Sequence, residues 1–273
     1  MLKGYDKNFG YKQKTGAPVV VKGNYHTHNY LCGHAGGTVS DFAEEAVKKG
    51  LIELGVSDHC KPPVDLNYPF LDLYTMDDAY LPQFDVARKK YEGKLKIFSG
   101  VEIEYFAGYD DYYKGLLSKL DYLVLGQHFY MRGATLRSSY CDGVDDENVL
   151  AYFDNVKAGL RSGYFSLLAH PDLIFKSGPK LTRAIEKGME SVVTAAKECG
   201  VPLELNANGV RNHNFDYPTD LLVGLCKAHN APVVVSADAH TPVDLCDSFV
   251  TDLYAYAVDN GLNVVWTLGI KAR

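Results

Sequence analysis

The sequence predicts an α/β fold in which parallel strands close into a barrel, with helices outside and a reactive site at one end. Three observations lead to this prediction. Short β-branched or apolar runs alternate with longer helical patterns from residue 18 onward. Seven or eight such units in about 250 residues suit a closed (β/α) barrel better than an open sheet. Histidines and carboxylates also recur where the predicted strands end.

The predicted strands are short runs rich in valine, isoleucine, leucine and aromatic residues. They cover residues 18–26, 52–59, 95–105, 121–128, 164–170, 201–208 and 231–240. A last run, residues 263–268, is either an eighth strand or a closing segment. Because helical patterns separate these runs, we expect βαβ units and a parallel sheet.

The predicted helices occupy the gaps between the strands. Ser40 is the expected N-cap of a helix over residues 41–49, with Glu44 close to the capping-box position and Gly50 as the stop. The other helices are expected at about residues 75–92, 110–119, 146–161, 180–198, 218–229 and 243–258. Each helix would carry the chain from the end of one strand to the start of the next.

The composition is that of an ordinary globular protein. The 273 residues are 47% hydrophobic and 23% charged, and the net charge of −6 argues against nucleic acid or an anionic membrane as a partner. No apolar run approaches the roughly 20 residues of a membrane helix, and the N-terminus lacks the apolar core of a signal peptide. We therefore expect a cytoplasmic protein. Its six cysteines form no Cys-x-x-Cys pair, and we expect them to be reduced.

The chain shows no internal boundary after its first residues. No Ser/Gly-rich linker and no low-complexity segment divides it. We therefore expect an N-terminal extension over residues 1–18 and a single barrel domain over residues 19–273. The sequence gives no indication of the oligomeric state.

Polar residues gather at the carboxyl ends of the predicted strands. Seven of the nine histidines lie at or just past such an end, the exceptions being His213 and His229. These histidines are His26, His28, His34, His59, His128, His170 and His240, and the other strand-end residues are Glu102, Glu104, Asn206, Asn208 and Asp238. The carboxyl ends of a parallel barrel all open onto one face, so we expect these side chains to converge.

A cluster of imidazoles and carboxylates suits zinc, iron or manganese. Positions i and i+2 of a strand point to the same side, so His26 and His28 can reach one ion. Each residue also has a simpler interpretation when taken alone. A strand-end histidine is often only hydrogen-bonded, Glu104 is expected to be solvated, and His229 is expected to end a helix. Recurrence across six strands favours a metal site over these separate explanations.

Seven short motifs follow one another in a fixed order, namely "HTH", "CGHA", "SDH", "GVEIEY", "GQHF", "AHPDLI" and "SADAH". This series resembles the polymerase-and-histidinol-phosphatase (PHP) superfamily over almost the whole chain after about residue 23. The resemblance implies a distorted (β/α)7 TIM-like barrel. It also implies a cluster of two to three divalent transition-metal ions, Zn, Fe or Mn, at the carboxyl ends of the strands.

The resemblance assigns nine metal ligands. It implies one metal bound by His26, His28, Glu102 and Asp238. Glu102 would bridge to a second metal, which His128 and His170 would also hold. A third metal would be bound by His34, His59 and His240. Gly33, Gly36 and Gly37 would let the loop that carries His34 turn back over the site, and Cys32 would touch no metal.

Within the superfamily, "LELNANGVR" and "HPDLIFK" are most similar to the PHP-type histidinol-phosphate phosphatases. This similarity implies hydrolysis of L-histidinol phosphate to L-histidinol and phosphate, a reaction of histidine biosynthesis. The expected mechanism is attack of a metal-bridging hydroxide on phosphorus. Glu102, Asp238 and His240 are the expected catalytic residues.

A cation is expected to bind the substrate phosphate, because a guanidinium group matches phosphate with two parallel hydrogen bonds. Arg211 is the first choice, Arg161 and Arg137 are weaker choices, and Lys176 is weaker still. His213 either faces the substrate or is an ordinary surface histidine.

Two other functions remain open. One is a phosphoesterase of the same fold that acts on another small phosphomonoester, a nucleotide or an oligonucleotide end. The other is a metal-binding regulatory or storage protein without catalysis. The sequence does not decide the metal, because histidine and carboxylate sites accept zinc, iron and manganese alike.

Overall fold

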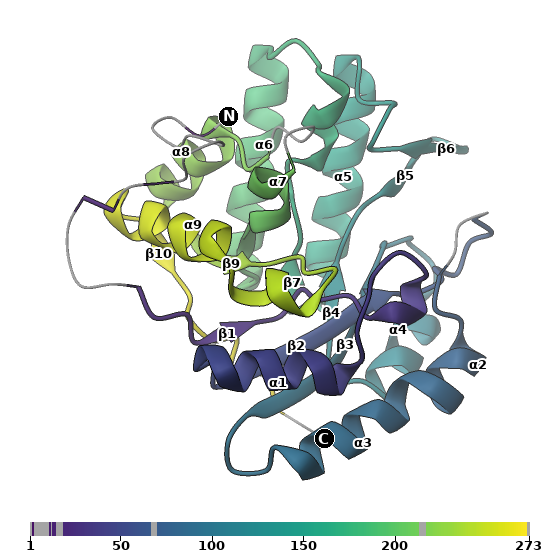
Figure 1. Ribbon diagram of the computed structural model, residues 1–273. Helices are drawn as coiled ribbons and strands as arrows, with labels where there is room; N and C mark the ends of the chain where they lie inside the picture. The colour runs from purple at the N-terminus through teal and green to yellow at the C-terminus, as the bar shows by residue number, and fades with distance from the viewer. Residues whose placement is uncertain are drawn as a thin grey trace.

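The computed structural model describes residues 2, 11, 13–14, 19–66, 70–212 and 217–271, and within them eight parallel strands form one curled sheet (Figure 1). The strand order is β1-β2-β3-β4-β7-β8-β9-β10. The strands are β1 Gly23–Asn24, β2 Glu53–His59, β3 Lys96–Ile103, β4 Tyr122–Leu125, β7 Leu167–Leu168, β8 Leu203–Asn206, β9 Pro232–Ser236 and β10 Asn263–Val264. All seven predicted strands are present, and the last predicted run supplies an eighth.

The sheet closes on itself just beyond β1 and β9. Thr27, after β1, forms a parallel bridge with Ala239, after β9. His28 N donates to Ala239 O at 2.8 Å, and Ala239 N donates to His26 O at 3.3 Å. β10 pairs only with the first residues of β9. The result is a distorted seven-stranded barrel with one additional strand at the opposite end, which confirms the predicted fold class.

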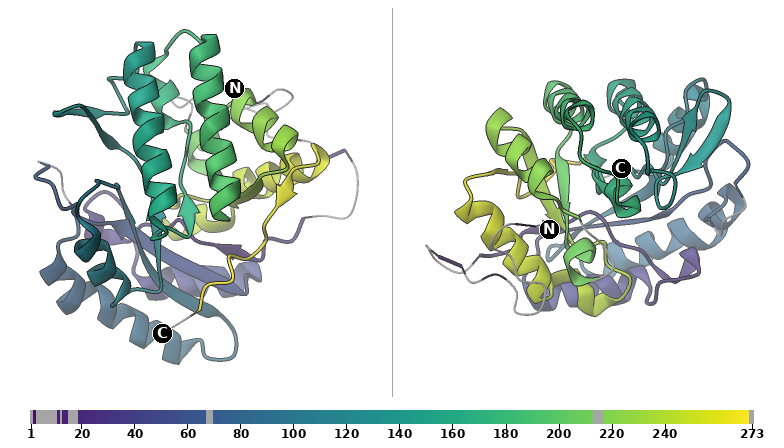
Figure 2. Two further views of the ribbon diagram at one scale, coloured as in Figure 1. Left: turned by 180° about the vertical axis from the view of Figure 1, so that it is seen from behind. Right: turned by 90° about the horizontal axis from the view of Figure 1, so that it is seen from above.

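Helices connect consecutive strands and lie outside the curled sheet (Figure 2). The α-helices are α1 Val39–Lys49, α2 Leu73–Thr75, α3 Leu81–Lys90, α4 Asp110–Leu117, α5 Asp146–Ser162, α6 Arg183–Cys199, α7 Ala207–Arg211, α8 Asp220–His229 and α9 Ser248–Asp259. Short 3-10 segments are η1 Tyr30–Cys32, η3 Leu173–Ser177 and η4 Pro242–Cys246, and a π-helical turn is η2 Met76–Tyr80. Among the described residues, no helix is both long and apolar enough to cross a membrane.

The first helix and its N-cap each begin two residues earlier than predicted. Thr38, not Ser40, caps α1, and its side chain accepts a hydrogen bond from the backbone of Asp41. Asp41 accepts in return from the Thr38 backbone, so it holds the capping-box position that we had given to Glu44. A threonine followed three residues later by an acid satisfies two N–H groups at once. Gly50 ends the helix with φ 80°, as predicted.

Two further elements were absent from the sequence prediction. After β4 the chain forms an antiparallel hairpin, β5 Phe129–Arg132 with β6 Thr135–Ser138. The short helix α7 follows β8 directly, and the Asn206 side chain caps it by accepting from Gly209 N. Both elements extend the chain at the carboxyl ends of the strands, next to the predicted site.

A separate apolar cluster, distinct from the packing between strands and helices, forms around Tyr25 and Tyr122. Its buried members are Tyr25, Phe98, Tyr122, Val124, Leu167, Ala169 and Val234. A Cβ at Gly55 or Gly100 would overlap the Tyr122 side chain, so these glycines make room for the ring. Leu268 and Ile270 pack against the same cluster from the C-terminal segment. The Leu268 N–H donates to the Tyr25 hydroxyl at 3.0 Å.

The structure describes Leu2, Tyr11 and residues 13–14 of the predicted extension, 1–18. Leu2 and Tyr11 are buried in the main core. The Tyr11 ring lies edge-on against Tyr256 of α9, with 5.3 Å between centroids, and Tyr11 N donates to Asp252 at 3.1 Å. Tyr11 therefore packs against α9.

Candidate metal centre

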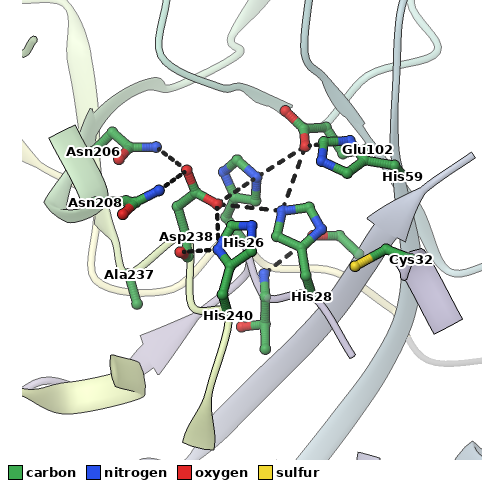
Figure 3. A network of polar contacts seen from close by, with 12 residues as sticks. His26, His28, Cys32, His59, Glu102, Asn206, Asn208, Ala237, Asp238 and His240 are labelled. Atoms are coloured by element: carbon green, nitrogen blue, oxygen red, sulfur yellow. Dashed lines mark hydrogen bonds and ion pairs between the residues drawn. The ribbon is translucent and has the colours of Figure 1, made fainter. Parts of the chain in front are cut away.

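The nine predicted metal ligands all lie at or beyond the carboxyl ends of the barrel strands, and Figure 3 shows how several of them point toward one another. His26 and His28 follow β1, and His34 follows η1. His59 ends β2, and Glu102 is the last but one residue of β3. The remaining ligands come from after β4, β7 and β9, namely His128, His170, Asp238 and His240.

Glu102 lies at the middle of the cluster, and its two carboxylate oxygens face different histidines. Oε2 lies 3.2 Å from His26 Nε2, 3.5 Å from His28 Nε2 and 3.1 Å from His59 Nδ1. Oε1 lies 2.9 Å from His170 Nε2 and 3.3 Å from His128 Nε2. One carboxylate therefore separates two groups of imidazole nitrogens.

Space for this carboxylate depends on a glycine of the neighbouring strand end. A Cβ at Gly126 would overlap Glu102 Oε1 and lie 2.6 Å from its carboxyl carbon. Such contacts are far shorter than real Cβ contacts. The "GQH" motif thus contributes a glycine that leaves room for the Glu102 carboxylate, and it also contributes His128.

Asp238 forms the second acidic member of the cluster. Its Oδ1 lies 3.2 Å from His28 Nε2 and 3.6 Å from His26 Nε2. Its Oδ2 accepts from the amides of Asn206 at 3.1 Å and Asn208 at 3.3 Å (Figure 3). The backbone of Asp238 is left-handed with φ 45°, a conformation that aspartate tolerates better than most residues. One oxygen is thus held by amides while the other faces the histidines.

His34 reaches the cluster from a loop that turns at glycines. Of the three glycines predicted to turn this loop, Gly33 and Gly37 have φ of 80° and 90°, whereas Gly36 is not in the left-handed region. The His34 ring lies with its centroid 5.3 Å from that of His59 and 5.1 Å from that of His240. These three histidines are the predicted ligands of the third metal. The Cys32 thiol donates to Asn29 O at 3.1 Å, and its predicted lack of metal contact stays a prediction.

A pocket of about 190 Å³ opens onto this cluster. Its described lining residues are His34, His59, Glu102, His128, Tyr140, His170, Asn208, Tyr217, Asp238 and His240. Seven of these ten are predicted ligands. Tyr140 and Tyr217 were not predicted, because 20 tyrosines in the sequence give no signal for any single one. The Tyr140 ring stacks parallel to that of His128 at 5.8 Å.

Both acidic members of the cluster are held in their charged form. Burial raises the pKa of Glu102, but the surrounding histidines, led by His26, outweigh burial and hold that pKa well below its usual range. Burial likewise opposes ionisation of Asp238, and His26 again leads the groups that hold its pKa well below the usual value. An ionised carboxylate is the form that binds a metal ion.

The histidines divide into two electrostatic groups. Burial lowers the pKa of His28 to about 4, lowers that of His59 well below its usual range, and lowers that of His34. For His26 and His128, burial also acts to lower the pKa, but nearby carboxylates outweigh it and raise both values. The lowered pKa values of His28, His34 and His59 favour the neutral form, which is the form that binds a metal. The raised pKa values of His26 and His128 favour the protonated form, which releases a proton when a metal binds.

The described residues fit a metal ion. His26 Nε2, His28 Nε2 and Glu102 Oε2 are buried and have no hydrogen-bond partner among the described groups, although they lie close together. Buried polar atoms are costly unless something satisfies them, and a cation bound between them would do so. Several sets of these side chains also bring their donor atoms within 4.8 Å of one another. The imidazole and carboxylate donors suit zinc, iron or manganese.

The predicted substrate-binding residues are not all at this site. Arg211 donates to Asp247 at 2.8 Å and to the carbonyl oxygens of Ala237 and Asp244 at 3.2 Å each. It is not among the described residues that line the pocket, and its substrate role stays a prediction.

Arg161 lies in the last turn of α5 and is exposed. This helix leaves the carboxyl ends of the strands and returns to the start of β7, so its last turn lies at the opposite end of the barrel. The structure therefore does not bring Arg161 to the pocket. His213 lies outside the described residues.

Two buried glutamates contact predicted ligands, and only Glu104 was among the strand-end residues expected to converge. Glu104 is buried, not solvated as predicted, and its Oε1 lies 3.0 Å from His128 Nδ1. Because residues i and i+2 of a strand share a face, its spacing from Glu102 was the available signal. Glu204 is fully buried and lies 2.8 Å from His26 Nδ1. The acidic residue inside the apolar run "PLELN" is the sequence signal for this buried position.

The fold and the site together define a parallel-barrel protein with a candidate metal centre at the carboxyl ends of its strands. Within that class, residues 24–208 match the family model described as the PHP domain. The chain belongs to the PHP domain family.

Two proteins that this chain resembles are named as histidinol-phosphatases. The chain is similar to the "Probable histidinol-phosphatase" of Deinococcus radiodurans, with 26% identity over 80% of this chain and 85% of the relative. It is also similar to the histidinol-phosphatase of Bacillus subtilis, with 25% identity over 81% of this chain and 94% of the relative.

A solved structure shares the fold. It is the histidinol phosphate phosphatase of Lactococcus lactis, in complex with zinc, L-histidinol and phosphate, with a TM-score of 0.69. The match covers 90% of this chain and 95% of that chain at 14% identity.

Proposed function

We propose that this protein is a metal-dependent phosphatase that hydrolyses L-histidinol phosphate to L-histidinol and phosphate. The observation that carries the proposal is the position of Glu102, whose two oxygens face separate groups of histidines, as a carboxylate shared by two metal ions requires. Membership of the PHP family and the names of its relatives support the reaction class and the substrate.

The residues that would hold the metals form three sets around the pocket. The first set is His26, His28, Glu102 and Asp238, and the second is Glu102, His128 and His170. The third set is His34, His59 and His240. Two to three ions of zinc, iron or manganese would offset the negative charge of the phosphate oxygens and lower the pKa of water.

The protein itself contributes orientation and charge. Asn206 and Asn208 hold one oxygen of Asp238, which leaves its other oxygen directed at the histidines. The ionised Glu102 and Asp238 add two buried negative charges that only cations can balance. A pocket of about 190 Å³ supports a small phosphomonoester as the substrate.

The first prediction concerns Glu102. Glu102→Gln keeps the size of the side chain but leaves one oxygen where two are needed, so one shared ligand is lost. We expect the variant to bind fewer metal ions per chain and to lose L-histidinol phosphate hydrolysis by roughly 100-fold or more. Metal content by mass spectrometry and release of inorganic phosphate measure the two effects. A metal-loaded wild-type protein that is inert on all phosphomonoesters would refute the proposed function, and would favour a storage or regulatory role.

The substrate is the finer part of the proposal. Another small phosphomonoester, a nucleotide or an oligonucleotide end is the alternative within the same family. A substrate panel at fixed salt and metal concentration distinguishes them by kcat/KM. The cytoplasmic location, the lack of a nucleic-acid or membrane partner, and the single domain over residues 19–273 stay predictions.

A further inference from the structure

Glu204 connects three parts of the candidate metal centre without facing the pocket. It lies on β8 and is fully buried. Its Oε1 lies 2.8 Å from His26 Nδ1. Its Oε2 accepts from the backbone N–H of His170 at 2.8 Å and from the Asn206 amide at 2.9 Å. Residues from after β1, from after β7 and from β8 itself therefore meet at one carboxylate.

We propose that Glu204 is a positioning residue, which fixes the ring nitrogen that His26 presents to the metal ions and anchors the backbone at His170. This inference rests on the metal site of the proposed function. The carboxylate can only accept, so His26 carries a proton on Nδ1. With the proton there, neutral His26 leaves its Nε2 lone pair free, and that atom lies 3.2 Å from Glu102 and 3.6 Å from Asp238.

The backbone at His170 adds to this role. His170 has φ 26°, which is in the left-handed region that side chains rarely adopt. The hydrogen bond from its N–H to Glu204 Oε2 holds this conformation while the ring reaches Glu102 at 2.9 Å. Outer carboxylates of this kind orient metal-binding histidines and commonly contribute a factor of about 10–100 to metal affinity.

An amide in place of the carboxylate, as in Glu204→Gln, cannot satisfy the same three donors. If the amide oxygen faced His26, the NH2 group would face the donors of His170 and Asn206. If the oxygen faced those donors, the NH2 group would donate to His26 Nδ1 and move the ring proton to Nε2. A protonated Nε2 cannot bind a metal. Either arrangement weakens one of the proposed ligands although the side-chain volume is unchanged.

The test compares full-length variants by their affinity for Zn²⁺ alone, in competition with a chromophoric chelator. Glu204→Gln removes the charge, and Glu204→Asp keeps an acceptor on both oxygens. Glu53→Gln is the matched control. Glu53 is a buried strand glutamate that accepts from Tyr25, and it lies at the start of β2, at the other end of the barrel. Circular dichroism of each metal-free variant checks that it is folded.

We expect Glu204→Gln to weaken the affinity for at least one Zn²⁺ ion by about 10–100-fold, with Glu204→Asp closer to wild type and Glu53→Gln unchanged. Equal Zn²⁺ affinity of wild type and a folded Glu204→Gln would overturn the inference. So would an equal loss in Glu204→Gln and Glu204→Asp, since that would show a packing effect. Zn²⁺ affinity is read without any substrate, so a failure of the phosphatase assay would leave this result intact.

Discussion

At the scale of single residues, the site depends on Gly126, which has no side chain, as well as on its predicted ligands. A Cβ at Gly126 would overlap Glu102 Oε1. Gly126→Ala is therefore expected to displace the Glu102 side chain. Overpacking of this kind costs about 1–3 kcal/mol of unfolding free energy. A displaced reactive group can lower the rate by about 100-fold. Urea unfolding and phosphate release measure the two effects.

Gly115→Ala is the matched control for this prediction. Gly115 lies in α4, and a Cβ there would meet nothing within 4 Å. Alanine in a helix is more stable than glycine by about 0.5–1 kcal/mol, so this variant should keep its activity and gain slightly in stability. Equal behaviour of the two variants would contradict a steric role for Gly126.

The convergence of the strand-end side chains could be predicted from the sequence because parallel strands bring their carboxyl ends to one face. The choice of nine ligands among them came from the resemblance to the PHP superfamily. The nine predicted ligands do converge there. Side-chain hydrogen-bond partners could not be predicted in the same way. Arg211 pairs with Asp247, and no local pattern indicates that a cation after β8 turns toward the segment after β9. Glu204 was missed because burial of a charge depends on partners from distant strands.

At the scale of elements, strand order and helix position followed the hydrophobic pattern, and the helix start did not. Thr38 and Ser40 are both good N-cap residues, so the sequence alone favours neither. The capping box that Thr38 forms with Asp41 decides between them. The β5–β6 hairpin was missed since its residues are mostly exposed or half-buried and its strands are only four residues long.

The Thr38 cap is expected to stabilise the start of α1. Thr38→Ala removes the side-chain acceptor at the start of α1 and should lower the free energy of unfolding by about 1 kcal/mol. Ser40→Ala, two residues later inside the helix, should change it little. Urea denaturation midpoints of the two variants provide the comparison. A larger loss for Ser40→Ala would restore the original N-cap assignment.

At the scale of the whole molecule, Tyr11 of the N-terminal extension packs against α9. Tyr11→Ala removes a buried ring and its hydroxyl contact with Asp259 at 3.0 Å, so we expect a loss of about 2–4 kcal/mol in unfolding free energy. Tyr11→Phe keeps the ring and should lose only about 1 kcal/mol. Denaturant unfolding measures both, and unchanged stability of Tyr11→Ala would show that the extension does not contribute.

The bridge between Thr27 and Ala239 also joins ligands that are synthesised at very different times. It joins the chain just after the first strand to the chain just after the last strand of the ring. Of the residues on either side of it, His26, His28 and Asp238 belong to the first proposed ligand set, and His240 belongs to the third. During synthesis on the ribosome, Asp238 is added long after the other members of that set, His26, His28 and Glu102. A nascent chain that ends before Asp238 would therefore lack one ligand of the first proposed set.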